Sequence, residues 1–231
     1  TNGVTYDIEV RAVTEGGPGE AATGQARPFT VPDAPALNIV EGDQELTISW
    51  EPVAGNGRAV ESYDVHVYGR LVASLPGNTT SYTIDQSWDG EAVQNGVDYQ
   101  IAVRAANEAG YSPFGLTSGA PYGVPTSPTD VDVTEGDTEL VLTWGEVENS
   151  NGRPVTAYRV YLNGELFEEV DADTFEVTID DLTNGEAYTV EVAAVNLRGE
   201  GDRSTVSDVV PYGVPGAPEV TVTEADRALE V

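Results

Sequence analysis

Three segments of this chain repeat one another at a spacing of about 90 residues. The segments 2–12, 95–105 and 184–194 all begin with Asn-Gly, carry Tyr at the fifth position and end on Ala. Such a period is too long for a helical solenoid repeat and is typical of arrays with one small β-domain per repeat. The matching positions are structural rather than reactive, so the repeat predicts the building block of the chain and leaves its ligand open.

Apolar residues occupy every second position through most of the chain. Leu46, Ile48 and Trp50 show this pattern, and it returns at 140–144. Alternation of this kind predicts β-strands with one buried and one solvated face. Short strands separated by Gly, Pro, Asn and Asp predict a β-sandwich. We therefore expect an all-β fold.

A proline-bracketed motif occurs at 28–32, 121–125 and 211–215. Proline fixes φ and removes a backbone donor, so a junction with two prolines is stiffer than a Gly/Ser linker. Each copy holds one aromatic residue, which we expect to pack between neighbouring domains. These aromatic residues are Phe29, Tyr122 and Tyr212.

The repeats and junctions together divide the 231 residues into four parts. We expect residues 1–31 to be the C-terminal part of one domain, 32–124 and 125–214 to be complete domains, and 215–231 to hold the N-terminal strand or strands of a further domain. Because the junctions are stiff, we expect the domains to lie end to end as a rod.

The landmarks of these units resemble the fibronectin type III domain. Trp50 and Trp144 stand at the end of the second strand, Tyr63 and Tyr158 lie on the third strand, and the stretch Leu182–Tyr188 carries Leu-x-x-Gly-x-x-Tyr. The resemblance implies tandem seven-stranded, disulfide-free sandwiches, a tyrosine whose hydroxyl bonds backbone upstream, and a role as spacer, adhesion or recognition module. The residues assigned to the structural core are Trp50, Tyr63, Tyr99, Trp144, Tyr158 and Tyr188.

One segment departs from the repeat. Ile84 and Tyr99 are 15 positions apart, whereas Ile179 and Tyr188 are 9 apart. Within the extra residues, either Val93 or Trp88 takes the place of the core leucine and the other is left at the edge. Trp88 then either folds back over the base of the sandwich or offers an exposed contact for a sugar, a peptide or a neighbouring domain.

Composition narrows the range of partners. Asp and Glu number 40 against 10 basic residues, all of them Arg, so the net charge is −30. Nucleic acid and membrane insertion are therefore not expected, since affinity for polyanions needs cationic side chains and no stretch is apolar enough to span a bilayer. The acidic surface favours solubility, and the composition is typical of halophiles and of high-GC bacteria. With no Cys, disulfides and thiolate chemistry are excluded.

The chain offers little material for chemistry, and we expect no catalytic, cofactor-binding or metal site. The single histidine, His66, should lie solvated on an outer strand face. The acidic pairs Glu41–Asp43 and Glu135–Asp137 fit turns on a solvated face, with calcium at a junction as the alternative. Arg198–Glu200 stands where an integrin-binding member of the family carries Arg-Gly-Asp, but its acid is one methylene longer.

These observations favour a non-enzymatic structural spacer and protein- or carbohydrate-interaction segment of a large multidomain extracellular bacterial protein. Two alternatives are an accessory linker segment of a secreted polysaccharide-degrading enzyme and a structural protein of a phage or appendage. The expected partners are neighbouring domains of the parent chain and an extracellular protein or polysaccharide. The chain is expected to be monomeric.

Overall fold

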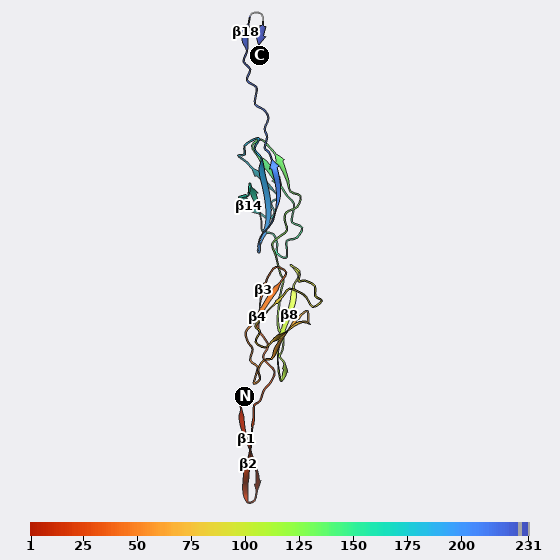
Figure 1. The fold of residues 1–231 in the computed structure, drawn as a ribbon, viewed down its shortest axis with the longest axis vertical. Helices are drawn as coiled ribbons and strands as arrows, with labels where there is room; N and C mark the ends of the chain where they lie inside the picture. The colour runs from red at the N-terminus through yellow and green to blue at the C-terminus, as the bar shows by residue number, and fades with distance from the viewer. Residues whose placement is uncertain (226–227, 231) are drawn as a thin grey trace. The chain divides into compact units, whose positions relative to one another are not determined.

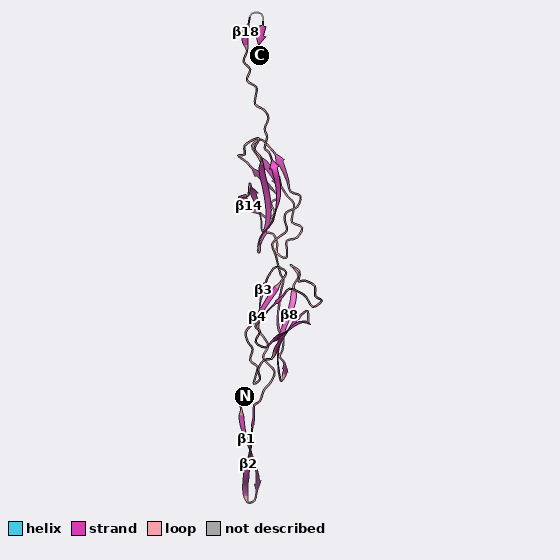
Figure 2. Ribbon diagram, in the orientation of Figure 1, coloured by secondary structure: helices cyan, strands magenta, loops and turns pink. Residues whose placement is uncertain are grey.

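The computed structural model describes residues 1–225 and 228–230, and these residues form strands, turns and loops with no helix (Figure 2). The expected all-β fold is confirmed. Backbone contacts divide the chain into two compact units. The first comprises Thr1–Gly123 with Asn151–Arg153, and the second comprises Val124–Ser150 with the residues from Pro154 onward.

The first unit begins with a hairpin and continues as a β-sandwich (Figure 1). One layer of the sandwich has the strand order β3-β4-β7, and the other has the order β10-β8-β5-β6 with β9 added to β8. All pairings are antiparallel. The strands are β1 (Tyr6–Thr14), β2 (Gly17–Ala26), β3 (Leu37–Glu41), β4 (Leu46–Trp50), β5 (Ser62–Val67), β6 (Arg70–Pro76), β7 (Ser81–Ile84), β8 (Tyr99–Asn107), β9 (Gly110–Tyr111) and β10 (Gly115–Gly119).

The second unit repeats this sandwich. Its layers have the strand orders β11-β12-β15 and β14-β13-β16-β17, and a separate hairpin, β18-β19, follows. The strands expected at 215–231 fall partly on residues 226–227 and 231, which lie outside the described residues. The strands are β11 (Asp132–Glu135), β12 (Leu140–Thr143), β13 (Ala157–Leu162), β14 (Glu165–Asp171), β15 (Glu176–Ile179), β16 (Tyr188–Asn196), β17 (Gly199–Val209), β18 (Thr223–Ala225) and β19 (Ala228–Glu230).

Each sandwich has its own hydrophobic core, made by the alternating residues of facing strands. In β4, Leu46 and Ile48 are fully buried while the residues between them are partly exposed. The fully buried side chains of the first sandwich come from both of its layers, and the second sandwich has the same arrangement. The buried residues of the first core are Leu46, Ile48, Trp50, Tyr63, Val65, Val67, Ile84, Val93, Tyr99, Ile101, Val103 and Ala105.

The insertion between β7 and β8 places Val93 rather than Trp88 in the core. Val93 is 1% exposed and corresponds to Leu182 of the second sandwich. Trp88 is 45% exposed, and the guanidinium carbon of Arg70 lies 4.2 Å from the centre of its ring. Arg70 therefore covers one face of the Trp88 indole, which lies outside the core.

Candidate functional site

Five of the six residues assigned to the structural core are buried inside the two sandwiches, and Tyr188 is partly buried against the second core. Trp50 is 3% exposed and packs on Tyr63 with ring centres 5.2 Å apart, and Trp144 packs on Tyr158 at 5.5 Å. These pairs join the second and third strands of each sandwich across the core. The pKa of the Tyr158 hydroxyl is raised, chiefly because the side chain is buried.

Two tyrosine hydroxyls accept backbone hydrogen bonds from the turns that precede them. The hydroxyl of Tyr99 accepts from the amide of Gln94 at 2.8 Å, and that of Tyr188 accepts from the amide of Thr183 at 3.1 Å. Each bond ties the turn before β8 or β16 to its strand. This is the geometry of a tyrosine corner.

The Asn-Gly of the repeated run is tied to the acidic turn between the first two strands of each sandwich. Asn95 donates to the Asp43 carboxylate at 2.7 Å and accepts from the amide of Gln44 at 2.9 Å. Asn184 makes the same two contacts with Asp137 and Thr138.

The glutamates of the two acidic turns are also engaged. Glu41 accepts from the amide of Ala120 at 2.9 Å, and Glu135 accepts from the amide of Val210 at 2.8 Å. Each glutamate therefore ties the end of the first strand of its sandwich, β3 or β11, to the segment that leaves the sandwich. Asp43 and Asp137 are exposed, as expected for turns on a solvated face, but the acidic turns also make structural hydrogen bonds that the sequence pattern did not reveal.

The first proline-bracketed segment lies against the loop between β4 and β5. The guanidinium carbon of Arg58 sits 4.1 Å from the centre of the Phe29 ring. The amide of Thr30 donates to the carbonyl oxygen of Asn56 at 3.1 Å. A side chain at Gly57 would lie 3.0 Å from the Cβ of Phe29, and its φ of +102° already favours glycine. The Asn-Gly-Arg loop is thereby fitted to this segment.

The first unit contains a second copy of this arrangement. The guanidinium carbon of Arg153 lies 4.3 Å from the centre of the Tyr122 ring, and the amide of Gly123 donates to the carbonyl oxygen of Asn151 at 2.9 Å. Arg153 also pairs with the Glu41 carboxylate at 2.6 Å. An aromatic residue capped by the arginine of an Asn-Gly-Arg loop is therefore a recurring element.

The third aromatic residue of the junction motif has a different environment. Tyr212 is 63% exposed. Its backbone bond is shared with the second copy, since the amide of Tyr212 donates to the carbonyl oxygen of Gly136 at 2.9 Å and that of Tyr122 donates to Gly42 at 2.8 Å. Packing of Phe29, Tyr122 and Tyr212 between domains stays a prediction.

A pocket of about 580 Å³ opens on the outer face of the first sandwich. Its floor is formed by β5, β8 and β10. Its walls are mainly apolar and aromatic, with one imidazole and one guanidinium among them. The lining residues are His66, Gly69, Gln100, Ile101, Ala102, Arg104, Phe114, Leu116 and Thr117.

The expectation that His66 is solvated is wrong. Alternation does place it on the outer face of β5, but it is only 8% exposed. The ring of Phe114 packs edge-on against it at 5.1 Å, and Phe114 also lies 5.3 Å from the guanidinium of Arg104. Side chains from neighbouring strands therefore bury a histidine that the strand pattern assigns to solvent.

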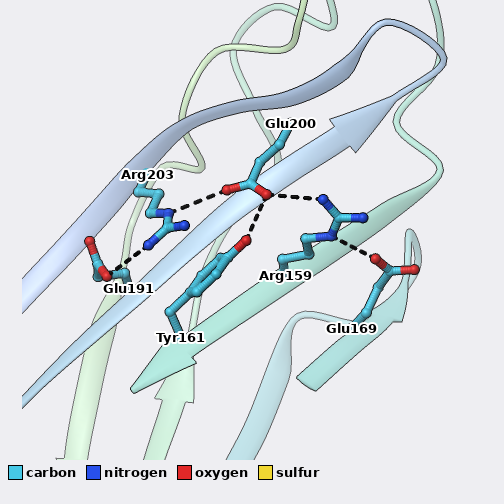
Figure 3. A network of polar contacts seen from close by, with 6 residues as sticks. All are labelled: Arg159, Tyr161, Glu169, Glu191, Glu200 and Arg203. Atoms are coloured by element: carbon cyan, nitrogen blue, oxygen red, sulfur yellow. Dashed lines mark hydrogen bonds and ion pairs between the residues drawn. The ribbon is translucent and has the colours of Figure 1, made fainter. Parts of the chain in front are cut away.

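The equivalent face of the second sandwich carries a closed polar network (Figure 3). The Glu200 carboxylate accepts hydrogen bonds from the Tyr161 hydroxyl at 2.6 Å, from Arg159 at 3.1 Å and from Arg203 at 3.3 Å. Arg159 and Arg203 each bind a further glutamate, Glu169 and Glu191 respectively, at 2.7 and 3.1 Å. The acid of the Arg-Gly-Glu run is therefore held on the sheet.

The network shifts the pKa values of its members. Partial burial raises the pKa of Glu200, but the hydrogen bonds from Tyr161, Arg159 and Arg203 outweigh this effect and hold it below its ordinary value. Burial, reinforced by the hydrogen bond to Glu200, raises the pKa of the Tyr161 hydroxyl. Both shifts favour an ionised Glu200 beside a neutral Tyr161.

Among residues 1–225 and 228–230, no group of three or more His, Cys, Asp or Glu is placed to hold a metal ion. The same residues include no helix with the length and apolar character that crossing a bilayer requires.

The fold and its tyrosine corners define a tandem array of immunoglobulin-like sandwiches. The fibronectin type III domain matches residues 33–118 and 126–210, and the chain belongs to this family.

Several known proteins are similar to this chain. A Kelch domain-containing protein of Sulfurisphaera tokodaii is 29% identical over 83% of this chain and 26% of its own length. Neural cell adhesion molecule L1.1 of Danio rerio is 26% identical over 91% of this chain and 20% of its own length. The chain thus spans about a quarter of these relatives or less. The crystal structure of chicken CNTN1 FN1-FN3 domains aligns with a TM-score of 0.44 at 20% identity, over 91% of this chain and 77% of that one.

Proposed function

We propose that this chain is a non-enzymatic spacer and interaction segment of a larger extracellular protein, with a bacterial cell-surface or secreted protein as the parent. Fibronectin type III domains are common in extracellular proteins and are typical of structural and interaction segments, and relatives of this chain include an adhesion molecule. The high acidic content of the chain supports a soluble, surface-exposed setting. In this proposal, 1–31 and 215–231 are parts of further domains of the array.

The observation that carries the spacer role is the repeated junction. Phe29 and Tyr122 follow a proline, each ring is covered by an arginine at just over 4 Å, and each following residue donates its amide to an Asn-Gly-Arg loop. Prolines restrict the backbone on both sides of each ring. A cation–π contact contributes about 0.5–2 kcal/mol depending on its exposure. We infer that such junctions restrict the angle between consecutive domains without locking it.

The absence of catalysis in this proposal has a chemical basis. A nucleophilic triad needs a histidine that contacts both a nucleophile and an acid. His66 is the single histidine of the chain, and within the described residues its Nδ1 faces a backbone carbonyl and its ring faces Phe114. Glu200, the most strongly engaged carboxylate, is already bound by two arginines and a tyrosine.

Small-angle X-ray scattering tests the spacer role. The radius of gyration and maximum dimension of the purified chain should match consecutive domains in extended order. The Tyr122→Gly variant should lose this extended order, and its scattering should be that of a broader ensemble of conformations. A Leu166→Ser variant is a matched control, because this side chain is 55% exposed on β14 and removing it should leave the scattering unchanged. A compact, folded-back particle for the unsubstituted chain would contradict the proposal.

A further inference from the structure

We propose that the pocket on β5, β8 and β10 binds a tryptophan or tyrosine side chain from a partner polypeptide. The inference deepens the interaction part of the proposed function and rests on it. The pocket volume of about 580 Å³ lies in the usual range of small-ligand sites, about 300–1,000 Å³. One aromatic side chain and the backbone beside it fit in that space.

The rim of the pocket favours a polypeptide over a free small molecule. Leu116 is 75% exposed, Phe114 is 43% exposed, and Tyr111, which stacks on the pocket residue Arg104 at 3.7 Å, is 53% exposed. Large apolar side chains gathered around a hollow are typical of interaction surfaces. A small molecule inside the pocket would leave these rim side chains in water, whereas a polypeptide that extends past the pocket covers them.

His66 supplies the chemical selectivity. Its Nδ1 lies 3.5 Å from the carbonyl oxygen of Gly69, and because a carbonyl only accepts, a neutral imidazole that makes this contact carries its proton on Nδ1. Nε2 is then an acceptor, and it is buried without a hydrogen-bond partner among residues 1–225 and 228–230. A buried acceptor without a donor is costly. The indole N–H and the phenol O–H are donors carried on apolar rings, so they match this site.

Entry of the ligand requires the Phe114 ring to move. Nε2 is buried, and the Phe114 ring packs edge-on against the imidazole that carries it. Phe114 lies in the short connection between β9 and β10 and is partly exposed, so its side chain has room to rotate outward. The partner ring would then replace the Phe114 ring against the imidazole.

The acidic charge of the first sandwich restricts which residues can flank the aromatic residue of the partner. Residues 33–118 hold twelve acidic residues against three arginines. Within the pocket, Arg104 pairs with Asp64 at 3.1 Å, so the wall itself carries no net charge. Neutral or basic flanking residues therefore suit the surface, and acidic ones are repelled.

The second sandwich provides an internal control. The strand pairing places Tyr161 at the position of His66, Glu191 at that of Ala102, and Arg203 at that of Phe114. In that sandwich these three side chains are hydrogen-bonded in the network of Figure 3. At these three positions the second sandwich therefore carries hydrogen-bonded polar side chains where the first sandwich has the pocket.

The test is an NMR titration of the full chain with two blocked tripeptides, Gly-Tyr-Gly and Gly-Phe-Gly, which differ only in the phenol O–H donor. Resonances of the pocket residues should shift for both peptides, and Gly-Tyr-Gly should bind roughly two- to tenfold tighter, as a single net hydrogen bond allows. His66→Phe keeps an apolar ring but removes the acceptor, so it should abolish this difference. Leu116→Glu should weaken binding of both peptides, and Thr205→Glu at the equivalent position of the second sandwich should change neither.

Shifts absent at millimolar peptide, equal affinities for the two peptides, or binding unaffected by Leu116→Glu would each overturn the proposal. If His66→Phe disturbs the fold, the affinities of the two peptides for the unsubstituted chain and for the Leu116→Glu variant still test whether the pocket binds them. A failure here leaves the spacer role standing, because scattering measures the junctions and does not depend on the pocket.

Discussion

Replacing Trp144 by alanine should remove a large share of the stability of the second sandwich. Trp144 is 5% exposed and packs on Tyr158, and its Nε1 makes no hydrogen bond with a described residue, so the substitution removes packing alone. A buried tryptophan hides at least about 150 Å², which at about 25 cal/mol per Å² corresponds to about 4 kcal/mol. Measured truncations of this kind cost about 3–5 kcal/mol, against a total of about 5–15 kcal/mol for a domain.

The assay must resolve the two units, because a chain with two cores does not unfold as one two-state system. Urea unfolding followed through backbone amide resonances separates them. In Trp144→Ala, the free energy of unfolding reported by the amides of β12, β13 and β16 should fall by about 3–5 kcal/mol. The free energy reported by the amides of β4, β5 and β8 should not change. Trp50→Ala should produce the reciprocal result, and Trp144→Phe, which keeps a ring, should cost less. A loss below about 1 kcal/mol in Trp144→Ala would refute the packing argument.

Three further predictions concern polar groups and charge. Tyr99→Phe should cost the first sandwich about 1 kcal/mol in urea unfolding, since it leaves the Gln94 amide without its acceptor; an unchanged midpoint would contradict this. The pKa of Glu200 is lowered by folding, so its contribution is present above its ordinary value of 4.5 and is lost as pH falls through the folded value. The stability gap between the unsubstituted chain and Glu200→Gln should therefore shrink below about pH 4.5 in pH-dependent unfolding, and a constant gap would argue against the network. The net charge of −30 should make thermal stability rise between low salt and about 0.15 M, where the screening length is about 8 Å; a flat or falling midpoint would mean that local ion pairs dominate.

The fold was predictable because its signals are local. Alternation in 46–50 and 140–144 places the tryptophans inside, and a tyrosine after Asn-Gly marks the corner. These patterns need only the period of a strand and the chemistry of a turn, so one sequence suffices to read them.

The candidate site was not predictable from such signals. The burial of His66 depends on Phe114, which follows it by 48 positions and reaches it through the pairing of β5, β8 and β10. The closure of the network around Glu200 depends in the same way on the register of β13 against β16 and β17. Strand alternation specifies a face but not the neighbours across it, since register comes from tertiary pairing.

The insertion before β8 shows the same limit. From the sequence, either Val93 or Trp88 can take the core position, because both are apolar and local spacing allows either. The structure selects Val93, which is smaller, and stacks Arg70 on Trp88 instead. Whether Trp88 contacts a partner stays a prediction.

The most direct test of the spacer role is a distance distribution across the second junction. The chain has no cysteine, so Val40→Cys on β3 and Leu166→Cys on β14, both at exposed positions, give two unique spin-label sites. Double electron–electron resonance should give one narrow distribution, which broadens in Tyr122→Gly and, to a smaller extent, in Arg153→Ala, since that arginine covers the ring. A distribution that is already broad in the unsubstituted chain, or whose width neither substitution changes, would contradict the account of this chain as a semi-rigid spacer.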